Sequence, residues 1–148
     1  MTNRQTKSNL SKCQNAVLVA KSAYETIKSQ VKAIETKILA DNEFYTDSNE
    51  RITKASATFR MNDTDFADFL DLRYAEIVKS GLPCNPPAGI APKDYVIEEP
   101  FRVALRLAED NLLNFAKTIV PSDVKYLFDT NDYNVKNELI ELTLSLKL

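Results

Sequence analysis

The sequence contains no histidine in its 148 residues. Histidine is the commonest general base in enzymes and a frequent zinc ligand. Its absence therefore excludes Ser-His-Asp triads, the common zinc sites and the Glu-x-x-His pairs of di-iron helical bundles. There is also no glycine-rich phosphate-binding loop. An enzyme that used only Asp, Glu, Tyr or Lys stays open, but we expect a non-enzymatic protein that carries no cofactor and no metal.

Glycine, tryptophan and cysteine are also scarce, with two, none and two residues. Few glycines argue against a β-sandwich, which needs many tight turns, and favour helices. Cys13 and Cys84 have no metal-binding spacing, and we expect free thiols, with a disulfide between them as the alternative. No stretch reaches the ~18 apolar residues of a membrane span, and the first twelve residues have no apolar signal core. We therefore expect a soluble, cytoplasmic protein.

The most regular pattern in the chain is a heptad repeat near the N-terminus. Apolar or small residues recur there at alternating steps of three and four, with no glycine or proline between them: Leu10, Cys13, Val17, Ala20, Tyr24, Ile27, Val31, Ile34 and Ile38. This seam predicts one long helix over about residues 8–40. The rest of the chain is expected to pack along it, or a second copy to pair with it. Leu18 and Val19 lie outside the seam and favour intramolecular packing, because a two-stranded coil would leave them exposed.

Periodicity and capping residues predict further helices over about residues 63–80, 100–120, 122–128 and 135–148. Asn62 or Asp63 is expected to cap the second helix at its start, and Gly81 to end it. Residues 48–60 are ambiguous between helix and strand, and we expect a short helix. The fold class is predicted to be all-α, a helical bundle organised on the long N-terminal helix, in one domain over residues 1–148.

A proline-rich irregular loop over residues 82–99 separates two of these helices. Proline fixes φ and removes an amide donor, so neither a helix nor a central strand is expected there. A loop of this length in a compact domain is usually functional or mobile. Leu82, Ile90 and Tyr95 in this loop, with Tyr45 in an earlier connector, are the candidate protein-binding residues. The alternative is that the loop is buried and structural.

Charge is distributed unevenly. Residues 1–40 contain seven Lys/Arg against two Glu, although the chain as a whole carries a net charge of −2. Lys21, Lys28 and Lys32 form a basic strip that could bind nucleic acid as an alternative function. Glu25 and Glu35 interrupt this strip, and the isoelectric point is acidic, so a solvated helical face is favoured.

Two acidic patterns could bind a metal ion. The cluster Asp63, Asp65, Asp68 and Asp71 is better explained as negative charge at the start of a helix. Asp129-x-Asn131 begins like a calcium loop, but its sixth position is Asn134 instead of Gly and its twelfth is Ile140 instead of Glu. No metal site is therefore predicted.

The absence of catalytic and metal-binding motifs, together with the predicted helices and the irregular loop, favours a non-enzymatic protein–protein interaction module with an unidentified protein partner. A stoichiometric inhibitor, an adaptor or an assembly subunit fits this description, and by analogy so do many viral or mobile-element accessory proteins. Two alternatives stay open. One is a nucleic-acid-associated protein that uses the basic strip, and the other is a homo-oligomeric scaffold that assembles through the seam. No membrane interaction is expected.

Overall fold

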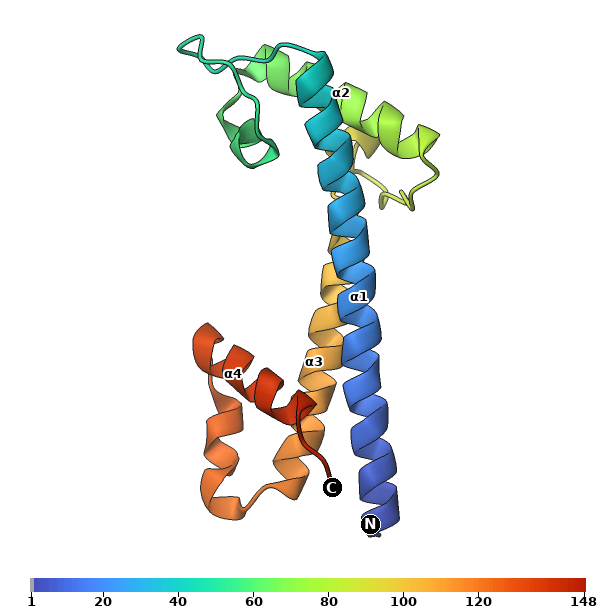
Figure 1. Ribbon diagram of the computed structural model, residues 1–148, viewed down its shortest axis with the longest axis vertical. Helices are drawn as coiled ribbons and strands as arrows, with labels where there is room; N and C mark the ends of the chain where they lie inside the picture. The colour runs from blue at the N-terminus through green and yellow to red at the C-terminus, as the bar shows by residue number, and fades with distance from the viewer. Residues whose placement is uncertain (1) are drawn as a thin grey trace. The chain divides into compact units, whose positions relative to one another are not determined.

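The computed structural model describes residues 2–148 and confirms the all-α fold class (Figure 1). Within these residues there is no strand, and two isolated β-bridges are the only extended pairing. In chain order the elements are α1 (Asn3–Asp41), the 3-10 helix η1 (Ala55–Arg60), α2 (Asp63–Lys79), the 3-10 helix η2 (Pro92–Asp94), α3 (Glu99–Ile119), the 3-10 helix η3 (Ser122–Asp129) and α4 (Tyr133–Leu144).

Helix α1 begins at Asn3, so the start predicted near residue 8 is wrong. The reason is a capping box at the beginning of the chain. The Thr2 hydroxyl accepts a hydrogen bond from the Gln5 amide at 3.1 Å, and the Gln5 side chain accepts one from the Thr2 amide at 2.9 Å. These two bonds satisfy amides that have no partner inside the helix. The polar first turn is thereby stabilised without an apolar residue.

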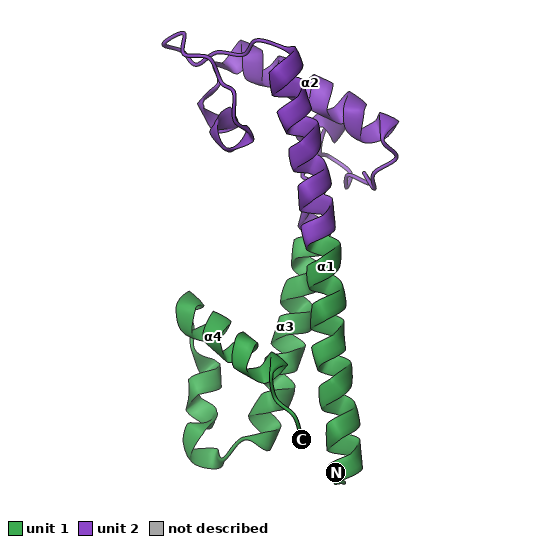
Figure 2. Ribbon diagram, viewed as in Figure 1, with its two compact units in different colours: residues 1–24, 100–148 green, residues 25–99 purple. Residues whose placement is uncertain are grey.

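The chain divides into two compact units (Figure 2). Unit 1 is Met1–Tyr24 with Pro100–Leu148, and unit 2 is Glu25–Glu99. Helix α1 contributes to both. The single domain that chain length suggests stays a prediction.

The core of unit 1 forms around the first half of the heptad seam. Leu10 and Val17 of α1 are buried with Leu112 of α3, and the Cys13 side chain packs at the edge of this core as a free thiol. The Gln14 side-chain amide lies within 3.3 Å of the carbonyls of Thr143, Leu144 and Leu146 and donates to them. These are carbonyls at a helix end, which need an outside donor. Helix α4 ends at Leu144, not at residue 148 as predicted, and it begins at Tyr133, where Asp132 caps it.

The core of unit 2 forms around the second half of the seam. The rings of Phe44 and Phe69 pack edge to face with centroids 5.8 Å apart. The remaining buried members of this core are Ile38, Leu39, Ile52, Met61 and Leu70. Helix α2 begins at its predicted cap, where the Asn62 side chain accepts a hydrogen bond from the Asp65 amide at 2.8 Å.

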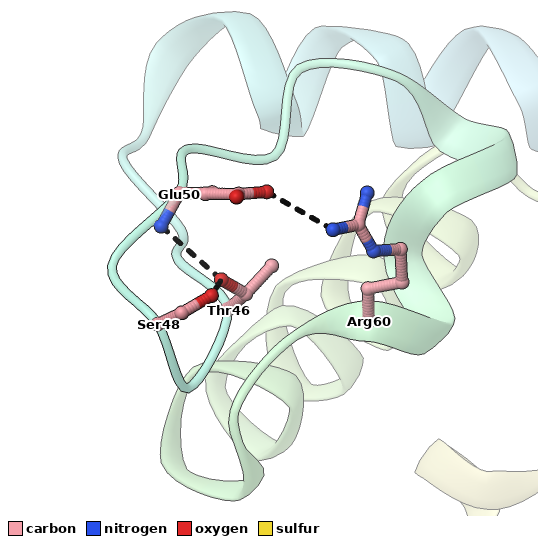
Figure 3. A network of polar contacts seen from close by, with 4 residues as sticks. All are labelled: Thr46, Ser48, Glu50 and Arg60. Carbon is pink, nitrogen blue, oxygen red and sulfur yellow. Dashed lines mark hydrogen bonds and ion pairs between the residues drawn. The ribbon is translucent and has the colours of Figure 1, made fainter.

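The ambiguous residues 48–60 contain a turn followed by the short helix η1. Asn49 takes a positive φ of 64° at the turn, and the bridges pair Tyr45 with Arg51 and Thr46 with Met61. Figure 3 shows the polar contacts that hold this turn. The Thr46 hydroxyl accepts from the Glu50 amide at 3.1 Å, and the Arg60 guanidinium donates to the Glu50 carboxylate at 3.0 Å. The short helix was predicted; the turn before it was not.

Candidate functional site

The proline-rich loop, residues 82–99, begins with an ordered helix end. Gly81 has a φ of +70°, its amide donates to the Val78 carbonyl at 3.1 Å, and the Leu82 amide donates to the Ile77 carbonyl at 3.2 Å. This is a Schellman motif, in which a left-handed residue satisfies the last carbonyls of a helix. Leu82 is therefore half-buried as part of the end of α2. Its place is explained by the helix cap and does not require a partner.

The second half of the loop is held to the body of unit 2. Ile97 is only 2% exposed, and the Lys93 ammonium of η2 pairs with the Asp71 carboxylate of α2 at 3.6 Å. The Ile90 amide donates to the Pro87 carbonyl at 3.3 Å, which closes the turn at Gly89. The loop therefore has a fixed backbone at both ends and in its middle.

Two apolar side chains of this loop lie outside the core. Ile90 is 44% exposed and Val96 is 49% exposed. The predicted residue Tyr95, which directly precedes Val96, is half-buried. Just under half of the surface of Ile90 and of Val96 is open to water. We call residues 90–96 the loop surface. It contains two of the four predicted binding residues, Ile90 and Tyr95.

Tyr45 belongs to a different part of unit 2. Its amide donates to the Asp65 carboxylate at 2.7 Å, and its carbonyl accepts from the Asn62 backbone amide at 2.9 Å. Its hydroxyl donates to the Glu43 carboxylate at 2.9 Å, and this hydrogen bond raises the pKa of Tyr45. These bonds join the end of α1 to the start of α2. No recorded hydrogen bond or ion pair within residues 2–148 connects Tyr45 with the loop surface.

The lysines of the predicted basic strip lie beside carboxylates. Lys28 and Lys32 line a groove of about 600 Å³ that is also lined by Glu25, Glu35 and Glu98. Lys21 belongs to unit 1, where its charge acts on Glu109. The surroundings of Lys28 and Lys32 are thus of mixed charge and not the continuous positive surface that a phosphate backbone favours.

Glu35 in this groove is a half-buried acid whose pKa is raised. Burial raises its pKa, the nearby Glu98 carboxylate raises it further, and Arg73 acts in the opposite direction. The Arg73 guanidinium lies 3.7 Å from the Glu35 carboxylate and also sits over the Phe69 ring, 5.9 Å from its centroid. Glu35 therefore has a structural partner and contacts the core of unit 2 through it.

The acidic residues of α2 have structural contacts. Asp65 accepts from the Tyr45 amide and from the Asn62 side chain, and Asp71 pairs with Lys93. In the part of the chain that the structure describes, no group of three or more His, Cys, Asp or Glu side chains is arranged to hold a metal ion. None of the helices there combines the length and the apolar character needed to cross a bilayer.

A polar cavity in unit 1 is the feature that the sequence pattern did not reveal. It has a volume of about 430 Å³ and is lined by Arg102, Arg106 and Lys136 among others. Arg102 and Arg106 are four residues apart, which places them on one face of a helix. The spacing of these two arginines is the only sign of the cavity that the sequence contains. The lining residues from α4 reach the cavity only through the tertiary fold.

The chain matches no protein-family model, no curated protein and no solved structure.

Proposed function

We propose that the chain is a non-enzymatic protein-interaction module that contacts its partner through the loop surface, residues 90–96. The single observation that carries this proposal is the combination of a held backbone and exposed apolar side chains. Ile97 and the Lys93–Asp71 pair hold the loop, while Ile90 and Val96 remain exposed. A stoichiometric inhibitor, an adaptor and an assembly subunit would all use such a surface.

A held loop is a favourable contact surface for an energetic reason. Association costs conformational entropy for every segment that becomes ordered, and a backbone that is already ordered avoids part of this cost. Full burial of an Ile or Val side chain contributes about 1.5–3 kcal/mol. Ile90 and Val96 would realise a fraction of this on contact with an apolar partner surface. Tyr95 adds an aromatic ring, a residue type enriched at interfaces.

Charge indicates what kind of partner would fit. Unit 2 contains nine Lys/Arg against fourteen Asp/Glu. Asp94 within the loop surface, and Glu98 and Glu99 just after it in sequence, add negative charge. A partner with an apolar patch and a basic rim would complement this surface, and its association rate would fall with rising salt. This distinguishes the proposal from nucleic-acid binding, which needs the opposite sign of charge on the protein.

The experiment compares tagged variants in quantitative affinity capture from native host lysate, after nuclease treatment. Ile90→Asp and Tyr95→Ala change the loop surface. Val19→Asp is the matched control, because Val19 is 63% exposed on α1 in unit 1. We expect one protein to be captured near stoichiometry by the wild type and by Val19→Asp, and to fall at least about tenfold with Ile90→Asp.

Circular dichroism of each variant separates lost binding from lost structure. Unchanged helical signal in Ile90→Asp with lost capture supports the proposal. Retention of the same protein by both loop variants contradicts it. A parallel capture without nuclease gives the other contradicting result, which is a protein that the wild type captures only when nuclease is left out.

A further inference from the structure

The cavity of unit 1 is built from two facing helices. Arg102, Arg106 and Glu109 line it from α3, and Tyr133, Lys136 and Asn137 line it from α4. Its volume of about 430 Å³ lies in the range of small-molecule sites. Figure 2 draws both helices in the colour of unit 1. The cavity therefore lies within a single unit.

The charge of the lining is positive. Three cationic side chains, Arg102, Arg106 and Lys136, face one carboxylate, Glu109, which leaves a formal charge of +2. Unit 1 as a whole contains ten Lys/Arg against seven Asp/Glu, whereas the full chain is negative. An anion would therefore be attracted to this unit and concentrated in the cavity.

The cations differ in how far their charge is already satisfied. The Lys136 ammonium pairs with the Asp110 carboxylate at 2.8 Å. For the Arg106 guanidinium, no hydrogen bond or ion pair is recorded with any of residues 2–148. Guanidinium groups bind phosphate with two parallel hydrogen bonds, and Arg106 has all its donors available for this.

The rest of the lining is apolar and aromatic. Ile140 is buried and Leu105 is half-buried, so both give the cavity apolar wall. Tyr24 and Tyr133 add aromatic rings, and the Tyr133 side chain is 78% exposed. An exposed aromatic side chain can stack on a flat ring of a ligand. The lining thus combines cations for an anionic group with surfaces for an apolar ring.

We propose that this cavity binds a small molecule in which an aromatic ring carries or adjoins a phosphate monoester. A phosphate monoester carries a charge of about −1.5 to −2 at neutral pH and offers several acceptor oxygens, so it can contact Arg106 and Arg102 together. Lys136, in contrast, is already paired with Asp110. Arg106 is the main phosphate ligand, Arg102 lies one helical turn away on the same face, and Tyr133 contacts the ring. This site is in unit 1 and is independent of the loop surface in unit 2.

The test is titration of the full chain with phenyl phosphate, followed by two-dimensional NMR of the backbone amides. Shifts are expected at residues 102–109 and 130–140. Inorganic phosphate and benzyl alcohol, each carrying half of the ligand chemistry, are expected to bind at least about tenfold more weakly. A parallel titration with adenosine 5′-monophosphate shows whether the site prefers a nucleotide or a smaller aromatic phosphate. The ligand with the lower dissociation constant identifies the preferred class, and binding of either one supports the site.

Arg106→Gln is expected to raise the dissociation constant for phenyl phosphate about tenfold or more, because a charged hydrogen-bonding partner is lost. Arg4 is an exposed arginine of α1 in the same unit, so Arg4→Gln is the control and should leave the dissociation constant unchanged. Because Arg106 is exposed and has no ion pair among residues 2–148, its replacement should leave the melting temperature unchanged, which the same samples verify. Absence of shifts with phenyl phosphate and with the nucleotide overturns the proposal. Equal affinity in wild type and Arg106→Gln, or shifts confined to other residues, also overturns it.

Discussion

Single residues at helix ends decide where this chain changes direction, and Gly81 is the clearest of them. It ends α2 with a φ of +70°, and a Cβ atom placed there would meet no other atom within 4 Å. Substitution therefore costs backbone strain and no steric clash. We predict that Gly81→Ala lowers the free energy of unfolding by about 1–2 kcal/mol.

Urea denaturation measures this loss, and Gly81→Asn is the matched variant. Asparagine tolerates the left-handed conformation better than alanine, so its loss should be smaller. Equal stability of the alanine variant and the wild type would show that the helix end does not need this conformation.

Glu35 provides a prediction about pH. Its pKa is raised above the ordinary value of 4.5, mainly by burial, so the folded chain favours the protonated acid. This stabilising contribution is complete below about pH 4.5 and is lost as the pH rises through the raised pKa. Glu35→Gln removes the titration. Its free energy of unfolding relative to the wild type should therefore increase between about pH 4.5 and pH 7.

The exposed Glu25 of the same groove supplies the control substitution, Glu25→Gln. Denaturation curves at four pH values give the comparison. A difference between Glu35→Gln and wild type that stays constant with pH would mean that Arg73 cancels the effect of burial on the pKa of Glu35. A difference that falls with pH would mean that Arg73 outweighs burial.

At the scale of elements, the proline-rich loop depends on one buried side chain. Ile97 is 2% exposed, whereas its neighbour Val96 is 49% exposed. Removing a buried isoleucine side chain leaves a cavity, and we predict that Ile97→Ala lowers the free energy of unfolding by about 2–5 kcal/mol. Val96→Ala should change it by no more than about 0.5 kcal/mol.

Limited proteolysis provides a second readout for this pair. Cleavage within residues 82–99 should become faster in Ile97→Ala and stay slow in Val96→Ala. Equal cleavage rates would show that Ile97 does not hold the loop.

Local sequence patterns were sufficient for most helices and insufficient for their surroundings. Asn62 and Gly81 mark the ends of α2 because capping chemistry depends on residues within one turn. The start of α1 was missed because Thr2 and Gln5 form a capping box in a polar stretch without apolar periodicity. The end of α4 was misplaced because Gln14, distant in sequence, bonds its final carbonyls. Tertiary contacts decided the boundaries that local patterns could not.

The candidate sites also differ in whether local sequence or tertiary contacts determine them. Proline content located the loop, and with it Ile90 and Tyr95, because proline excludes regular structure by itself. Sequence alone places Tyr45 in a loop as an accessible aromatic residue, but its backbone bonds to Asp65 and Asn62 are long-range and explain its position. The unit 1 cavity needs α4 to face α3, which no single-helix pattern contains.

At the scale of the whole molecule, the heptad seam is used by the chain itself. Leu10 and Val17 lie in the core of unit 1, and Ile38 lies in the core of unit 2. Ile27 is 3% exposed without a second copy present. Leu18 and Val19, which were expected to be covered by intramolecular packing, are instead 54% and 63% exposed. Self-association through the seam stays a hypothesis, and it makes a distinct prediction from intramolecular packing.

We predict that Ile27→Asp destabilises the monomer by about 3–5 kcal/mol, because an unpaired carboxylate replaces a buried apolar group. Circular dichroism should show a lower melting temperature at every protein concentration. The exposed-site substitution Val19→Asp should not change it. A variant that keeps its helical signal while its sedimentation coefficient falls to that of a smaller species would instead favour assembly through the seam.

Hydrogen exchange of the chain alone and in complex with its captured partner tests the central proposal most directly. If the loop surface is the contact, amides of residues 90–96 should become slower to exchange in the complex by at least about tenfold, while those of α4 stay unchanged. Protection confined to the exposed face of α1 or to unit 1, with residues 90–96 exchanging as in the free chain, would contradict the proposed role of the loop.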